Sequence, residues 1–224
     1  MNKLLLAMGI CMLVFNPARV FSQRKADIGL FGGTAYYMGD INPNRHFYRP
    51  SLSVGALYRY NINTRYAIKA HGYYAQLSGS DLDFPGLLHP DRPVSPMSFN
   101  TSLIDAGLEV EFNFLPFTPN LGTLEYTPYL STGISGALIV HSDVNSQNVL
   151  SFPFGAGVKL NLSKRISTGA EWTFRKTFND RMDGVENPSG KVSFLHNNDW
   201  YSFLGIFITY KFFNFATGCP AYDE

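Results

Sequence analysis

Apolar and polar residues alternate over several long segments, and this alternation constrains the fold more than any other feature of the chain. In residues 150–161 the apolar side chains occupy even positions, whereas serine, glycine, lysine and asparagine occupy odd ones. Successive side chains of a β-strand point to opposite faces, so the pattern indicates a strand with one apolar face. The same pattern recurs in residues 51–61, 66–74, 104–114, 129–138, 166–175 and 204–212. In these seven segments we expect the even positions to share one face; the glycine-rich segment 27–37 is a further strand of ambiguous facing.

Most of these strands have about ten or more residues, the length that a tilted strand needs to cross a membrane. Strands of soluble sandwiches follow the same period but are usually shorter, about five or six residues. Charged residues make up only 16% of the chain, against about 25% in soluble domains. Aromatic residues gather beside the short turns, as at a membrane interface: Tyr58, Tyr60, Tyr66, Phe112, Phe114, Tyr210 and Phe212. The sequence therefore predicts an all-β, up-and-down antiparallel transmembrane β-barrel of about eight strands within residues 23–213.

The connections between the segments alternate in length. Tight turns are expected at 62–64 and 163–164 and a moderate one at 116–124, whereas 39–50, 78–98, 141–148 and 179–199 are longer. Outer-membrane barrels have short periplasmic turns and long external loops, so both termini are expected in the periplasm. Pro153 falls inside a strand, where it cannot donate to the ladder, and we expect a bulge there.

The two ends of the chain lie outside the barrel in this interpretation. Residues 1–22 are typical of a secretory signal peptide, with Lys3 before a short apolar run. Residues 214–224 form a periplasmic tail that contains Cys219, the one cysteine left after cleavage. In an oxidising compartment such a cysteine is a free thiol or half of an intermolecular disulfide. The formal net charge of +1 gives no electrostatic case for nucleic-acid binding.

The polar faces of the strands carry charges of both signs in nearly equal number. A barrel of about eight strands is just wide enough for its own side chains to fill, and enclosed charges must be paired. We therefore expect a salt-bridged, filled interior without a conducting pore; an ion path or a catalytic dyad of Glu109 and Glu111 is the alternative. The predicted network consists of Arg59, Lys69, Asp105, Glu109, Glu111, Lys159, Glu171, Arg175 and Lys211.

No residue pattern identifies a catalytic centre, a cofactor or a metal site. A lipid-modifying barrel enzyme would need a nucleophile with a base in reach, such as serine with histidine. His71 is expected inside the barrel and the other histidines of the mature chain in or beside loops, and no spacing selects a pair. The enzyme and a surface adhesin that uses the two longest loops remain the alternatives to a structural, non-catalytic role.

The N-terminal third of the mature chain resembles the PorG family. The resemblance lies in the glycine-rich stretch 27–33, in Tyr37-Met38-Gly39-Asp40-Ile41-Asn42, and in Arg49-Pro50, Tyr58-Arg59-Tyr60-Asn61-Ile62-Asn63 and Gly79-Ser80-Asp81. It implies an outer-membrane component of the type IX secretion system of Bacteroidota, which also serves gliding motility in some members. The family is thought to act by association, attaching to a periplasmic ring built from a lipoprotein and a soluble partner.

A filled barrel without a pore can only anchor, position or recruit, which agrees with that role. The expected partners are outer-membrane lipid and the two ring proteins. The hypothetical partner-binding residues are in the tail: Gly218, Cys219, Pro220 and Tyr222. Cys219 could form the intermolecular disulfide.

Overall fold

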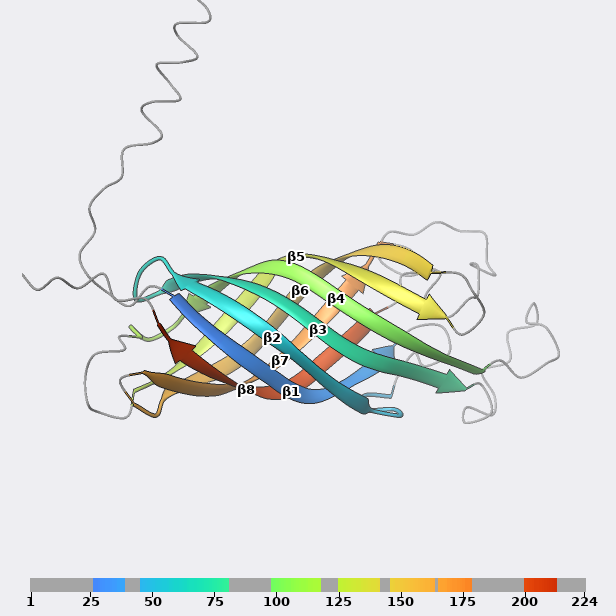
Figure 1. Cartoon of the computed structure of the whole chain (residues 1–224), viewed down its shortest axis with the longest axis horizontal. Coiled ribbons are helices and arrows are strands. Elements are labelled where there is room, and N and C mark those ends of the chain that lie inside the picture. The colour runs from blue at the N-terminus through green and yellow to red at the C-terminus, as the bar shows by residue number, and fades with distance from the viewer. Residues whose placement is uncertain are drawn as a thin grey trace, which may run out of the picture.

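Eight antiparallel strands close into a barrel in the computed structural model of the protein (Figure 1). The structure describes residues 26–38, 45–80, 98–117, 125–141, 146–163, 165–178 and 200–212. The strands are β1 (Ala26–Met38), β2 (Ser51–Asn61), β3 (Tyr66–Ser80), β4 (Ser98–Asn113), β5 (Tyr126–His141), β6 (Ser146–Asn161), β7 (Ile166–Thr177) and β8 (Trp200–Lys211). Each strand pairs with the next, and β8 pairs with β1. The predicted fold class is confirmed.

Closure brings the start of the first strand and the end of the last strand to the same end of the barrel. Asp27 at the start of β1 lies opposite Lys211 at the end of β8. The short connections between β2 and β3 and between β6 and β7 lie at this end, which we call the short-turn end. The predicted signal peptide at 1–22 and the tail at 214–224 are outside the described residues. The described residues contain no helix long and apolar enough to cross a membrane.

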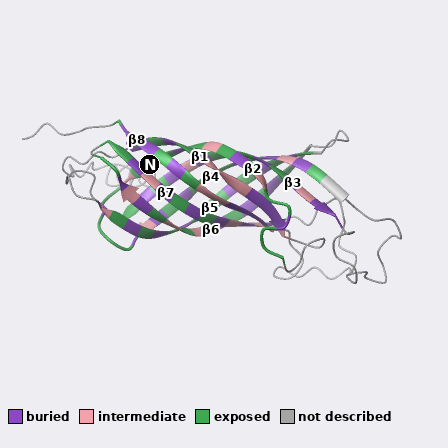
Figure 2. Cartoon of the chain, turned by 90° about the horizontal axis from the view of Figure 1, so that it is seen from below, coloured by how far each residue is buried: buried purple, intermediate pink, exposed green. Residues whose placement is uncertain are grey.

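Even-numbered residues face outward along the strands, as predicted for the seven alternating segments. In β2, Leu52 and Val54 are exposed, whereas Ser53 and Arg59 are buried. The ambiguous first strand follows the same rule, since Ile28 is exposed and Phe31 is buried. Figure 2 shows the resulting bands of buried and exposed residues along the strands. Because a register slip of one residue would reverse every side chain, the shared parity fixes the whole barrel wall.

Strands β3 to β6 are longer than the alternation predicted, and they extend beyond their neighbours in Figure 1. Their added ends carry buried apolar residues at odd positions, so the alternation of apolar even and polar odd positions stops there, but they still pair in register. These buried residues are Leu77, Leu103, Ile139 and Val149. One consequence is that the connection between β5 and β6 spans only 142–145. The long connection expected at 141–148 was therefore wrong, because half of these residues belong to the paired strands.

The bulge expected at Pro153 is also absent. Pro153 lies opposite Arg175, and the register between β6 and β7 is the same on either side of it. On the β5 side, the pairs Thr132–Phe154 and Ser135–Ser151 keep one register across the proline. The Thr132 hydroxyl donates a 3.2 Å hydrogen bond to the Pro153 carbonyl. The proline therefore interrupts hydrogen bonding without displacing the strand.

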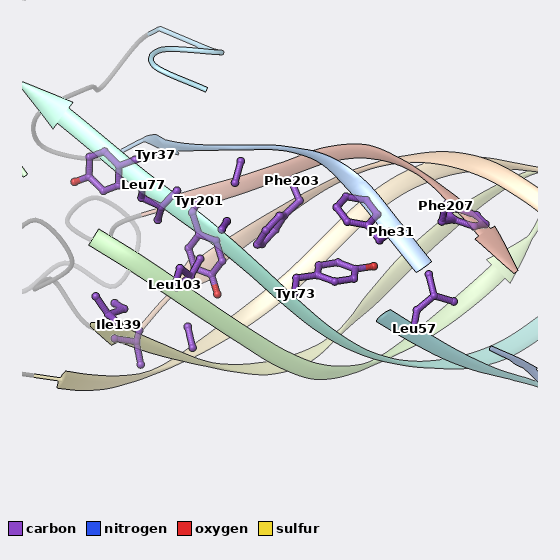
Figure 3. Close-up of a cluster of buried hydrophobic side chains, with 14 of the residues drawn as sticks. Phe31, Tyr37, Leu57, Tyr73, Leu77, Leu103, Ile139, Tyr201, Phe203 and Phe207 are labelled. Atoms are coloured by element: carbon purple, nitrogen blue, oxygen red, sulfur yellow. The ribbon is translucent and has the colours of Figure 1, made fainter. Parts of the chain in front are cut away.

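Glycine on the inner wall makes room for rings inside the barrel. A Cβ at Gly157 would lie 2.6 Å from both the Ala170 carbonyl oxygen and the Tyr129 ring, and one at Gly205 would lie 2.5 Å from the Phe31 ring. Figure 3 shows the interior cluster to which Phe31 belongs, with Tyr73 and Phe203 beside it. Phe31 stacks on Tyr73 with ring centroids 4.5 Å apart. The absence of side chains at these glycines lets a small barrel hold a ring and a charge network together.

Candidate functional site: a charged interior and an apolar outer wall

The first group of interior charges surrounds Glu111 of β4. Arg59 of β2 donates from Nε to Oε2 at 2.7 Å and from Nη2 to Oε1 at 3.1 Å, so the pair is bidentate. Lys159 of β6 approaches the same Oε2 at 2.5 Å and also donates to Asn113 at 3.0 Å. Asp27 lies 3.6 Å from Arg59. Two cations and two carboxylates from four strands thus neutralise one another near the short-turn end.

Lys211 lies next to this group, and one of its partners is a neutral amide oxygen atom. Its Nζ donates a 2.6 Å hydrogen bond to Oδ1 of Asn161, which also accepts from the Ser167 hydroxyl at 2.7 Å. The ammonium lies 5.2 Å from the centre of the Phe117 ring. Since Phe117 belongs to the connection after β4, this ring lies against the short-turn end of the interior.

The second group is centred on Glu171 of β7. Its carboxylate accepts hydrogen bonds from Lys69 at 2.9 Å, from Tyr73 at 2.8 Å and from Tyr129 at 2.8 Å. The ammonium of Lys69 also lies 3.2 Å from Glu109. Side chains from β3 and β5 therefore converge on one buried carboxylate of β7, which satisfies most of its lone pairs.

A third group surrounds Asp105 of β4. It contacts Nε2 of His71 at 2.7 Å, Nε of Arg175 at 3.1 Å and the hydroxyl of Tyr201 at 2.5 Å. Nδ1 of His71 lies 3.2 Å from Glu109. Glu109 is thus within ion-pair distance of Lys69 and His71, although neither of its oxygens meets hydrogen-bond geometry. His71 lies between two carboxylates.

All nine residues of the predicted network point into the barrel, and each is at most 2% exposed. Asp27 is a tenth member that the sequence reasoning missed, because the facing of the first strand was ambiguous. Its odd position was the signal, since every other inward charge is also at an odd position. With Asp27, the described part of the interior holds five acidic residues against five lysines and arginines. This balance explains how so many charges are enclosed.

The structure separates the two glutamates considered as a dyad. Glu109 and Glu111 share the inner face of β4, but Glu111 is paired with Arg59 and Lys159, whereas Glu109 lies against Lys69 and His71. Among the described residues no group of three or more acidic, histidine or cysteine side chains is arranged to hold a metal ion. The tail residues Gly218, Cys219, Pro220 and Tyr222 lie outside the part that the structure describes.

The outer wall is apolar at mid-height and aromatic at both ends. The predicted girdle at the short-turn end is exposed or half-exposed, and within it Tyr66 lies 5.3 Å from Phe112, ring centre to ring centre. A second aromatic group at the opposite end was not predicted. In it Phe154 stacks on Phe174 at 5.6 Å, and Trp172 lies 5.0 Å from Phe174. The sequence shows that these aromatic residues are at even, outward positions, but it does not show the strand register that brings them together.

A closed eight-stranded antiparallel wall, apolar outside and charged inside, defines a small up-and-down barrel of the outer-membrane type. The solved structure of Neisserial surface protein A (NspA) has this fold: it covers 86% of this chain and all of its own, with 13% identity and a TM-score of 0.52. The N-terminal β-barrel domain of OprF from Pseudomonas aeruginosa matches 84% of this chain and 99% of its own, with 17% identity and a TM-score of 0.44. The outer membrane protein OprG from the same organism matches 84% and 97%, with 10% identity and a TM-score of 0.45.

The family assignment comes from the sequence. Residues 3–221 match the family described as "Domain of unknown function (DUF6089)", and the chain belongs to it. No curated protein matches the chain significantly.

Proposed function

We propose that this protein is a non-catalytic outer-membrane component of the type IX secretion system that anchors or positions a periplasmic ring complex at the outer membrane. The observation that carries the membrane part is the polarity of the wall. Ile206 is 68% exposed and Leu30 is 67% exposed, whereas Arg59 and Glu111 are at most 1% exposed. In water, a stable domain has the opposite arrangement.

A bilayer removes this contradiction. Lipid tails solvate the outer wall, and the closed ladder leaves no strand edge unpaired. The aromatic groups at both ends of the wall then lie at the two interfaces, where such rings are enriched. We place the short-turn end, and with it both termini, in the periplasm, because outer-membrane barrels have their short turns on that side.

The role in secretion is supported by the resemblance to the PorG family and by the filled interior. The motif at residues 58–63 lies at the short-turn end. Its tyrosines, Tyr58 and Tyr60, belong to the short-turn girdle. Arg59 pairs with Glu111, and Asn63 accepts a hydrogen bond in the adjacent turn. The motif therefore builds the barrel end that faces the periplasm in this proposal. An interior occupied by paired charges suits a protein that acts by association.

The proposed partners are outer-membrane lipid, the ring lipoprotein and its soluble ring partner. The surface offered to them is the short-turn end together with the tail 214–224. The tail contains Cys219, for which we propose an intermolecular disulfide.

The test is removal of residues 214–224 in the native host. We expect cargo secretion to be lost while the barrel still inserts, as judged by its heat-dependent mobility on gels and its recovery in the outer membrane. Cys219→Ser is the matched variant: on non-reducing gels it should remove a higher-mass band that contains the barrel.

Three results would contradict parts of the proposal. Normal secretion without the tail would remove the anchoring role of the tail. An unchanged band pattern for Cys219→Ser would remove the disulfide. Loss of function on exchange of the long loops, with the tail dispensable, would favour an adhesin instead.

A further inference from the structure

One charged side chain stands on the otherwise uncharged outer face of the strands. Among the outward-facing strand positions in the described part, Lys176 of β7 is the only charged residue. It lies near the end opposite the short turns, between Phe152 on one side and Trp200 on the other. Its Nζ lies 5.4 Å from the centre of the Trp200 ring. Because the outer wall disfavours charge, Lys176 is set apart from the other outward-facing strand residues.

A groove in the outer wall begins at Phe174, two residues before Lys176 on the same face of β7. Trp200 meets Phe154 edge-on at 5.8 Å, and Phe154 lines a groove of about 520 Å³ over β4 to β7. Thr132 and Ala156 are small residues along it, and Phe112 marks its extent toward the short-turn girdle. The groove is therefore apolar, elongated across the wall and continuous with the aromatic surroundings of Lys176.

The segment after β1 adds a second polar ring to the same rim. His46 lies on the outside of the barrel, with its ring 6.4 Å from Phe174 and 6.2 Å from Trp172. Phe47 stacks on Trp172 at 5.8 Å, and the Trp172 indole donates a 3.2 Å hydrogen bond to Tyr36. The segment thus packs on the wall, and the exposed imidazole of His46 is held at the end of the groove away from the short turns.

We propose that this groove and rim form a binding site for an anionic, phosphate-bearing membrane lipid, with the headgroup at Lys176 and one acyl chain in the groove. The inference rests on the proposed membrane location. Charge complementarity selects the occupant: lysine extends its ammonium from an apolar surface toward the interface, where anionic lipid headgroups lie. The neighbouring indole and phenyl rings limit access of water and so strengthen the attraction.

The tryptophans provide a local reporter. The chain has two, Trp172 and Trp200, and both lie at this rim. The full protein is refolded into vesicles that mix phosphatidylglycerol with phosphatidylcholine, with bromine on the acyl chains of one lipid or of the other. Bromine quenches tryptophan fluorescence on contact, so the two mixtures report which lipid occupies the site.

We expect quenching to correspond to about a fivefold preference for the anionic lipid at low salt, the effect of about one lysine near a charged lipid surface. The preference should fall in high salt. Lys176→Gln should abolish it while quenching by both lipids persists. Arg165→Gln, an exposed cation at the opposite end, is the matched control and should leave the preference unchanged.

Equal quenching by the two lipids in the native protein, or a preference that survives Lys176→Gln, would overturn the lipid site while leaving the membrane location intact. If neither lipid quenches although the gel shift shows a folded barrel, a second copy of the chain covers the groove, and the proposal is again wrong. Failure to insert at all would overturn the proposed function first.

Discussion

At the scale of single residues, the interior is held by charges that depend on one another. Glu111 accepts from Arg59 at two atoms and from Lys159 at a third contact, and all three side chains are at most 1% exposed. A buried ion pair adds little net stability over an apolar pair of the same shape, but removal of one partner leaves the other charge uncompensated. The contribution of the network to the free energy of unfolding is therefore large only when one partner is removed.

Glu111→Gln tests this dependence. The amide keeps the shape but removes the negative charge between Arg59 and Lys159, so we expect the free energy of unfolding to fall by about 3–5 kcal/mol. The measurement is a urea titration of the barrel refolded into vesicles. Glu125→Gln, a half-buried carboxylate at the short-turn end, is the control and should cost less than about 1 kcal/mol. Equal effects of the two changes would mean that the interior charges are independent.

The sequence predicted which residues are inside but not which ones meet. Parity alone placed Arg59, Glu111 and Lys159 on the inner face. Their convergence depends on strand tilt and on the order in which the wall closes, since Arg59 and Glu111 come from β2 and β4, which are not paired neighbours. Asp27 was missed because glycine on both faces of β1 hid its alternation.

At the scale of elements, the packing around each strand depends on which residues are glycine on its inner face and on its outer face. Inward Gly157 of β6 leaves space for the Tyr129 ring, whose hydroxyl reaches Glu171. Outward Gly136 of β5 has nothing within 4 Å of the place where a Cβ would stand. Glycine is therefore required by packing at Gly157 on the inner face, whereas at Gly136 on the outer face a larger residue would fit. Alternation predicted the faces, but only the register shows which glycines are required.

Gly157→Ala and Gly136→Ala form a matched pair. The first places a methyl group 2.6 Å from the Ala170 carbonyl and from the Tyr129 ring, so we expect a loss of about 1–3 kcal/mol. The second meets no neighbour and should be neutral or slightly stabilising, because alanine restricts the unfolded chain. Unfolding titrations of both variants measure the difference. A neutral Gly157→Ala would show that Tyr129 moves freely, contrary to its packing.

At the scale of the whole molecule, two surfaces of opposite polarity exchange the places they have in a soluble protein. The alternation predicted this inversion, because apolar even positions and charged odd positions can be satisfied together only with lipid outside and ion pairs inside. Strand extents beyond the apolar band were not predicted, since the added ends of β3 to β6 pair although their odd positions include buried apolar residues such as Leu77, Leu103 and Ile139. The hydrophobic layer, rather than the hydrogen-bonded ladder, is what the pattern reports.

Ile206 of β8 provides the sharpest test of that inversion. It is 68% exposed on the outer wall and lies opposite Gly32 of β1 and Ala170 of β7. If lipid covers the wall, Ile206→Arg places a cation near the middle of the bilayer and should lower the free energy of unfolding by about 2–4 kcal/mol. Leu162→Arg, also on an exposed apolar residue but in a short turn, should cost about 0–1 kcal/mol because it reaches the interface. Both are measured by refolding titrations in vesicles. Near-equal costs would mean that no depth-dependent apolar layer surrounds the barrel, since depth is the variable that separates the two sites.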